Sequence, residues 1–280
     1  MAIIEEEEEE DKRKPESNRY KNKSSTPRLR GEFEGRHDIV STGTPKLDGS
    51  LGGGFLSNSM VLIAHQASYR YAELLNCILP AEIGREFYLI LVDYGRHVED
   101  LFYKMGVFEL KGEKVKNDRV LSLDRMRIIN CFSSEVGNEK YLYNDKMYTL
   151  DDPFDNDKLF SIMKTVRESL PENAWVVWLF FSLTDLSIGV SEPYITRFFR
   201  RVSRLHKQYG DLAFYPLNMD AHSTKFQAMI SHMTDVIINF KREDTGEKLK
   251  NYIQVIKGPF LINTKRLYYD IDSNGNFIYY

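Results

Sequence analysis

Several features that would define a class of protein are scarce in this sequence. Two cysteines, Cys77 and Cys131, are too few for a disulfide framework or a zinc cage, and we expect two buried thiols in a reducing cytoplasm. The longest apolar run, Trp175–Phe181, has the length of a strand, whereas a membrane-spanning helix needs about twenty residues. The first residues lack the basic and apolar segments of a secretory signal. The sequence therefore predicts a cytoplasmic protein with no membrane partner.

Charge is unevenly distributed, although the chain as a whole has a net charge of only −3. Residues 5–11 are all acidic, and residues 12–30 contain eight basic side chains against one acidic side chain. Because residues 1–33 have almost no apolar content, we predict a disordered tail there and one folded domain over residues 34–280. Such a tail either keeps the protein soluble or offers its basic part as an arm for nucleic acid or an acidic partner.

Beyond the tail, apolar runs of strand length alternate with amphipathic segments of helical length, which predicts an α/β fold in three layers. The predicted strands are nearly continuous apolar runs, typical of parallel strands covered on both faces. They span residues 60–64, 87–92, 127–130, 175–180 and 212–216, and the predicted helices span 67–79, 97–105, 157–169, 193–208 and 223–232. After Asp235, short alternating segments separated by turns predict antiparallel strands that extend the sheet.

The place to look for a ligand is the carboxyl end of the first strand, since parallel sheets bind ligands at that edge. Residues 41–60, which precede and enter this strand, contain Ser-Thr-Gly, Leu-Asp and Leu-Gly-Gly-Gly. This arrangement resembles the entry to the core of KaiC-like and RecA-like ATPases. The three glycines at 52–54 come before the strand, so we interpret them as a tight turn and not as a phosphate loop.

The resemblance implies a glycine-rich loop after the strand, ending in Gly-Lys-Ser/Thr, whose backbone, lysine and hydroxyl hold the phosphates and Mg²⁺. This chain has no glycine there. Tyr71 stands at the lysine position and Ala72 at the position of the magnesium ligand, while Arg70 replaces the charge only in part. We therefore interpret the loop as a degenerate nucleotide site, and its residues are His65, Gln66, Ser68, Arg70, Tyr71 and Ala72.

Three further positions of the resemblance have changed. Relatives end the second strand in two acids, one of which polarises the attacking water, and this chain has Asp93 followed by Tyr94. Relatives end a later strand in an aspartate that orients the magnesium shell, and Phe181 stands there; Asp185, four residues on, is a poor substitute. Near the C-terminus, relatives have Lys-x-Arg, which reaches a neighbouring subunit's nucleotide. Here Lys257 is kept and the arginine position is Pro259.

The helix predicted over residues 193–208 has a row of basic side chains spaced three or four residues apart, and hence on one face. These are Arg197, Arg200, Arg201, Arg204 and Lys207. Two interpretations stay open. The row is either the solvated outer face of an α/β layer or a contact for a nucleic-acid backbone.

We conclude that the sequence is similar to the KaiC-like branch of the RecA superfamily, resembling RadA paralogues, which implies an archaeal source. We expect a catalytically inactive regulatory or assembly subunit that associates with itself or with a RecA/KaiC-like paralogue. It should need no cofactor, with neither ATP nor Mg²⁺ bound, and the six histidines form no pair at metal-ligand spacing. The alternatives are a nucleic-acid-binding protein of DNA repair, with DNA or RNA as partner, and a residual ATPase with a displaced site around Arg70 and Asp93.

Overall fold

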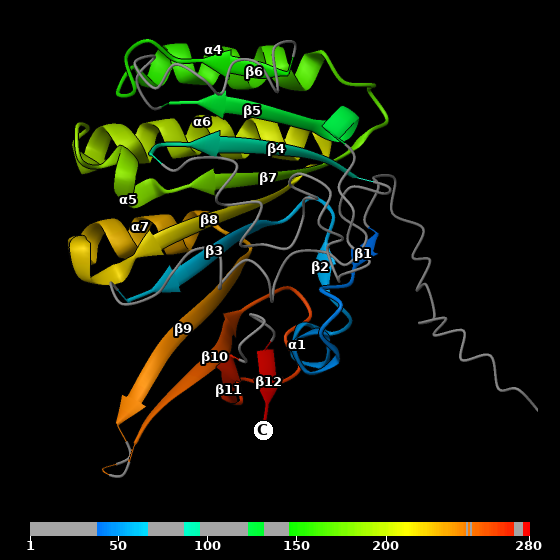
Figure 1. The fold of residues 1–280 in the computed structure, drawn as a ribbon, viewed down its shortest axis with the longest axis vertical. Helices are drawn as coiled ribbons and strands as arrows, with labels where there is room; N and C mark the ends of the chain where they lie inside the picture. Colours follow the sequence, from blue (N-terminus) through cyan, green and yellow to red (C-terminus); the bar gives the residue numbers. More distant parts are fainter. Residues whose placement is uncertain are drawn as a thin grey trace, which may run out of the picture. The chain divides into compact units, whose positions relative to one another are not determined.

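The centre of the protein is one ten-stranded sheet, seen in Figure 1. The structure is a computed structural model that describes residues 38–66, 87–95, 123–131, 146–244, 246, 248–271 and 277–280. The strand order is β12-β11-β10-β9-β3-β8-β7-β4-β5-β6, so strands far apart in the sequence are neighbours. Such crossovers between parallel strands are typical of the α/β class, and they place the carboxyl ends of several strands along one edge.

The parallel part of the sheet consists of β3 (Met60–His65), β4 (Phe87–Asp93), β5 (Met126–Asn130), β7 (Trp175–Phe181) and β8 (Leu212–Asn218). All five predicted strands are confirmed, each within two residues of its predicted ends. They form because apolar side chains on alternate faces enter two separate hydrophobic cores, one on either side of the sheet. The short strand β6 (Met147–Thr149), which we did not predict, pairs in parallel with β5 at the edge.

The C-terminal extension is antiparallel only in part. The strand β9 (Val236–Asp244) runs parallel to β3, whereas β10 (Leu249–Lys257), β11 (Leu267–Ile271) and β12 (Phe277–Tyr279) follow in antiparallel order. The expectation that the antiparallel arrangement starts after Asp235 is therefore wrong by one strand. The physical reason is that α7 (Thr224–Met233) returns the chain to the amino end of β3 before β9 begins.

Three helices cover one face of the sheet: α4 (Asn156–Glu168), α6 (Glu192–Tyr209) and α7. Their apolar sides pack against the second core, and all three predicted helices are confirmed within one residue. Figure 1 shows them side by side behind the sheet, with α6 in the middle. The predicted helices at 67–79 and 97–105, and the predicted tail at 1–33, lie outside the described residues.

The other face is covered in part by α1 (Pro45–Leu51), which lies near the two-stranded sheet of β1 (Ile39–Val40) and β2 (Phe55–Leu56). The glycines that follow α1 form the predicted turn. Gly52 ends the helix in the left-handed conformation, with φ of 77°. A Cβ atom on Gly54 would lie 2.2 Å from the carbonyl oxygen of Val40. Glycine is thus required here by the close approach of two backbones.

Two short helical segments lie at the carboxyl ends of strands, α5 (Leu183–Leu186) after β7 and the 3-10 turn η3 (Met219–Ala221) after β8. A third, η1 (Leu123–Arg125), precedes β5. None of these was predicted, since segments this short have no periodicity to detect. Among the described residues, no helix is long and apolar enough to cross a membrane.

A buried ion pair closes the amino end of the parallel strands. The guanidinium Nε of Arg167 lies 3.0 Å from both carboxylate oxygens of Asp211, and the indole of Trp178 donates to the same carboxylate at 2.9 Å. Arg167 and Asp211 are 0% and 1% exposed. Burial raises the pKa of Asp211 to about 6, although the positive charge of Arg167 acts to lower it. Every charge in this group has a partner inside the protein, as burial requires.

Candidate functional site

The carboxyl edge of β3 is where the resemblance places a nucleotide, and two of the predicted residues can be located there. His65 ends β3 with its side chain buried, and its Nδ1 lies 2.8 Å from the carbonyl oxygen of Gln66. The side-chain oxygen of Gln66 accepts from the backbone N–H of Arg242, at 3.4 Å. Gln66 thus faces the part of β9 that extends beyond β3. Ser68, Arg70, Tyr71 and Ala72 lie outside the described residues.

Asp93 and Phe181 lie side by side at the same edge, because β4 and β7 pair in register at these two residues. Both side chains are 2% exposed. The carboxylate of Asp93 accepts from the backbone N–H of Gly95 at 3.2 Å, a bond that turns the chain after β4. Phe181 belongs to the first hydrophobic core. At this position a hydrocarbon ring, which cannot bind a metal ion or orient water, is packed beside the surviving acid.

Tyr94 points to the opposite face of the sheet, into the second core, where its ring lies 5.7 Å from that of Phe180. Burial is the main cause that raises its pKa well above the ordinary value. Because successive side chains of a strand alternate between faces, position 94 is directed away from the side where Asp93 lies. The phenol of Tyr94 is therefore a core group.

Asp185 is tied to the start of α5. The hydroxyl of Ser182 donates to its carboxylate at 2.8 Å, and the backbone N–H of Asp185 donates back to that hydroxyl at 3.2 Å. This reciprocal pair is a helix cap. The carboxylate of Asp185 is thus bound at the N-terminal end of α5.

Lys257 is also bound within the chain. Its ammonium donates to the carbonyl oxygens of Ser231, at 3.0 Å, and of Thr234, both at the C-terminal end of α7. A cation at that end of a helix satisfies carbonyls that have no partner in the helix and complements the helix dipole. Pro259, at the position where relatives have arginine, is exposed. The ammonium of Lys257 thus caps the C-terminal end of α7.

The basic row on α6 faces outward as predicted. Arg197, Arg200, Arg204 and Lys207 are exposed, and Arg201 is half-buried. Two of the five have acidic partners from other elements, which the sequence did not reveal: Arg201 pairs with Asp157 of α4, and Lys207 with Asp235 at 3.2 Å. Arg197, Arg200 and Arg204 have no acidic partner within the part of the chain that the structure describes.

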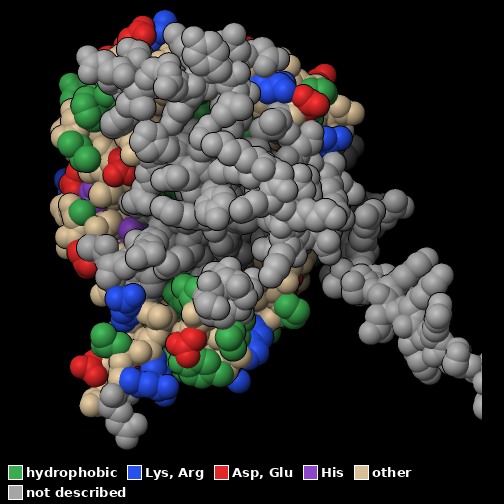
Figure 2. Space-filling view, in the orientation of Figure 1, with side chains coloured by type: hydrophobic (Ala, Val, Ile, Leu, Met, Phe, Trp, Pro, Cys, Tyr) green, Lys and Arg blue, Asp and Glu red, His purple; other side chains and the backbone are tan. Residues whose placement is uncertain are grey.

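Most of the positive charge on this surface belongs to α6 itself, since α4 has two exposed cations and two exposed acids and α7 adds one cation. On α4, α6 and α7 together, eight cations are exposed or half-buried, against three acids. The whole chain, by contrast, has a net charge of −3. Positive charge is therefore concentrated on the outer surface of α6. We call this surface the α6 face, and its residues are Tyr194, Arg197, Arg200, Arg201, Arg204 and Lys207. Figure 2, which looks at the opposite side, shows a second group of Lys and Arg over the β9–β10 hairpin.

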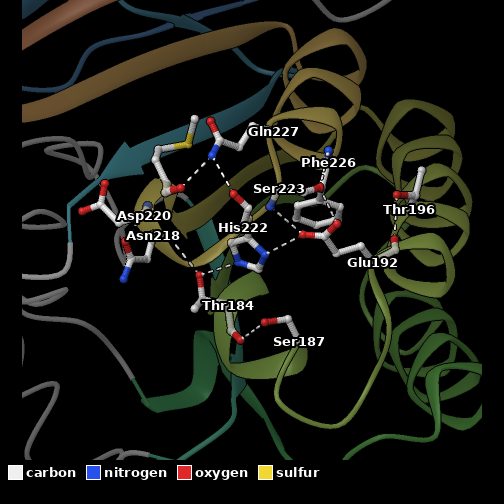
Figure 3. Close-up of polar contacts among 11 residues, drawn as sticks. Thr184, Ser187, Glu192, Thr196, Asn218, Asp220, His222, Ser223, Phe226 and Gln227 are labelled. Atoms are coloured by element: carbon white, nitrogen blue, oxygen red, sulfur yellow. Dashed lines mark hydrogen bonds and ion pairs between the residues drawn. The ribbon is translucent and has the colours of Figure 1, made fainter.

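A polar group that the sequence did not predict lies at the carboxyl ends of β7 and β8 (Figure 3). The imidazole of His222 lies between two partners, with Nε2 at 3.2 Å from the hydroxyl of Thr184 and Nδ1 at 3.5 Å from the carboxylate of Glu192. The side chain of His222 is 2% exposed. Glu192 also accepts from the backbone and the hydroxyl of Ser223, at 2.9 and 2.5 Å.

This group joins the first turn of α6 to the first turn of α7 and to α5. The hydroxyl of Thr184 accepts from the backbone N–H of Asn218, at 2.9 Å, so the end of β8 is tied in as well. Burial lowers the pKa of His222 and its carboxylate neighbour opposes that shift, while the Ser223 bonds lower the pKa of Glu192. A neutral imidazole between a carboxylate and a hydroxyl can pass a proton or hold the hydroxyl in one orientation.

No signal in the sequence could have assembled this group, because its members come from three separate helical segments. Ser223 alone is recognisable as the N-cap of α7. Within the described residues, His, Cys, Asp and Glu side chains form no group of three that could hold a metal ion.

The fold is the RecA-type α/β fold of the KaiC-like kind, with a mostly parallel sheet and antiparallel strands at its C-terminal end. A KaiC-like protein, PH0186, of the hyperthermophilic archaeon Pyrococcus horikoshii superposes with a TM-score of 0.61 over 87% of this chain and 99% of its own, at 15% sequence identity. At that identity the likeness establishes the fold alone. No family model matches the sequence, and no curated protein matches it.

Proposed function

We propose that this chain is a catalytically inactive RecA-type protein that acts as a regulatory or assembly subunit, associating with itself or with an active paralogue in the cytoplasm. The observation that supports this most is Phe181. Its ring is 2% exposed and belongs to the core, beside Asp93, at the strand end where the resemblance implies a magnesium-orienting acid. Lys257 adds support, since its ammonium is bound to the end of α7. The changed loop positions Tyr71 and Ala72 point the same way.

Titration calorimetry of the full-length protein with ATP and Mg²⁺ tests this proposal. We expect no binding tighter than roughly 1 mM, because the groups that neutralise phosphate and hold the metal are replaced. Size-exclusion chromatography coupled to light scattering should give the same molar mass for the protein with and without ATP and Mg²⁺. Micromolar binding of the nucleotide would contradict the proposal. Phosphate release above background that disappears in Asp93→Asn would instead support a residual ATPase.

A second candidate function is nucleic-acid binding by the α6 face. It is favoured by the five exposed or half-buried cations against one acid, Glu192, on α6, in a chain with net negative charge. Arg200 and Arg204, one turn apart and exposed, have no acidic partner within the described residues, so their charge is available to phosphates. If α6 were only a solvated outer helix, an excess of positive over negative side chains on it would not be required.

The test is fluorescence anisotropy with a labelled oligonucleotide at several KCl concentrations. Reversing the charge of Arg200 and Arg204 together (Arg200→Glu, Arg204→Glu) should abolish or strongly weaken binding, and the wild-type affinity should fall steeply with salt. The matched control reverses two exposed lysines on the β9–β11 side, Lys241→Glu with Lys265→Glu, and should keep most of the affinity. Affinity that responds neither to salt nor to the arginine pair would exclude this function.

A further inference from the structure

We infer that the α6 face binds single-stranded nucleic acid, with Tyr194 as a stacking platform for a base and the arginines beside it as contacts for the following phosphates. This inference rests on the second candidate function and narrows its ligand to one class. It starts from the position of Tyr194, which is 63% exposed in the first turn of α6, at one end of the basic row.

Tyr194 is exposed on a helix whose other aromatic side chains near it are buried in the core. The apolar side chains of α6 that pack in the core, such as Phe198, Phe199 and Val202, are almost fully buried. Tyr194 lies outside that buried side, and the guanidinium of Arg197 lies 5.9 Å from the centroid of its ring. Much of the ring is thus open to a planar ligand, and an arginine lies beside it.

The arginines continue the same surface along the helix axis. Arg197, Arg200 and Arg204 follow Tyr194 at intervals of three and four residues, so that the row from Tyr194 to Arg204 covers about 15 Å of the helix axis at about 1.5 Å per residue. The guanidinium of Arg201 lies over the ring of Phe160 in α4, 4.2 Å from its centroid. This contact packs the side of α6 that has Arg201 against α4. A strand of nucleic acid laid along α6 would meet an aromatic ring first and then a series of cations.

The choice of a single strand over a duplex follows from the ring. Bases in a duplex are stacked on one another and offer no free face to a side chain, whereas a single strand offers every base. Stacking does not depend on the identity of the base, so we expect little sequence preference. An acidic polypeptide would also be attracted by the arginines, but it would gain nothing from Tyr194.

The experiment compares a labelled 20-nucleotide oligothymidylate with a 20-base-pair duplex of mixed sequence, using the full-length protein at low and moderate KCl. Tyr194→Ala should weaken binding of the single strand roughly 5- to 100-fold, the range expected for one lost base stack, and leave the duplex almost unaffected. Tyr194→Phe keeps the ring and should bind like the wild type. Because Tyr194 is mostly exposed, both variants should unfold at the wild-type temperature.

The outcomes separate this inference from the function on which it rests. If the variant with Arg200→Glu and Arg204→Glu loses both ligands while Tyr194→Ala changes neither, nucleic-acid binding stands and the single-strand inference is wrong. If no oligonucleotide binds at low salt, both are wrong. If poly-glutamate displaces the single strand from the arginines with equal effect in wild type and Tyr194→Ala, the surface belongs to an acidic protein partner and the inference is again overturned.

Discussion

The two polar groups at opposite ends of the parallel strands differ in how completely the protein encloses them. At the amino end, Arg167 and Asp211 are 0% and 1% exposed, and Trp178 completes the carboxylate's bonds. At the carboxyl end, His222 is equally buried, but the side chain of its partner Glu192 is 33% exposed. The closed group has no route to solvent or ligand, so its role is structural. The open group lies at the edge where this type of fold binds ligands.

The difference predicts that the closed group is the costlier to break. Asp211→Ala leaves the buried guanidinium of Arg167 without its carboxylate, and the free energy of unfolding should fall by about 3–5 kcal/mol. Urea denaturation measures the loss. The control is Asp151→Ala, an exposed acid, which should stay within about 0.5 kcal/mol of the wild type. If Asp211→Ala lowered the free energy of unfolding by less than about 1 kcal/mol, Arg167 and Asp211 would not be a fully buried ion pair, and the prediction would be wrong.

A smaller loss is expected at the carboxyl end. Glu192→Gln removes the charge from the acceptor that holds Ser223 and His222, and should lower the free energy of unfolding by about 1–2 kcal/mol. Part of the effect is screened, because Glu192 is one-third exposed. If Glu192→Gln lowered the free energy of unfolding as much as Asp211→Ala, the two groups would be equally shielded from solvent, and the proposed difference between them would be wrong.

The open group should also respond to pH through His222. Burial lowers the pKa of His222 in the folded state, so the unfolded chain binds more protons as the pH falls through the ordinary histidine value of about 6.5. Stability is therefore full above that pH and decreases below it. His222→Asn should reduce this decrease, seen as a smaller difference in unfolding free energy between pH 7.5 and pH 5.5. An unchanged difference would show that His222 does not titrate in this way.

His206, near the amino end, provides a comparison for that measurement. Burial, together with the charge of Arg167, lowers its pKa to about 3, and its ring nitrogen pairs with the hydroxyl of Tyr215. Like His222, His206 makes the folded protein less stable as the pH falls. This effect is the same in the wild type and in His222→Asn, because both contain His206. The difference between these two proteins therefore isolates the carboxyl-end histidine.

The smallest effect on stability is expected on the α6 face. Arg200→Ala with Arg204→Ala should change the free energy of unfolding by less than about 0.5 kcal/mol, since both side chains are exposed and have no acidic partner within the described residues. Relief of repulsion between neighbouring cations can even make the change favourable. A loss above about 1 kcal/mol in urea denaturation would show that these arginines are part of the fold and not a free surface.

The sheet and the helical layer were predictable because burial leaves a recognisable pattern in the sequence. The strands β3, β4, β5, β7 and β8 are buried on both faces and appear as short, nearly continuous apolar runs, whereas the helices α4, α6 and α7 are buried on one side and have apolar residues at helical spacing. The parallel direction of β9 was not predictable from its alternation, which is the same for either direction of pairing. The short helices α1 and α5 depend on caps and on neighbouring backbones.

The candidate site divides in the same way. The sequence showed that Phe181 ends an apolar strand, at a position where the resemblance implies an acid, and that five cations share one side of α6, since order and spacing are enough for both statements. It could not show that Arg201 and Lys207 have acidic partners, or that Lys257 caps α7, because those partners come from other elements.

By itself, the sequence determined the fold class, the position of the strand ends and the concentration of positive charge on one helix, all of which follow from local apolar runs and helical spacing. Only the tertiary structure decided which charges remain available, and only it brought Thr184, Glu192 and His222 together. The reason is that crossovers bring residues 30 or more positions apart in the sequence together at one edge of the sheet, and their separation along the sequence does not reveal that they are close in space.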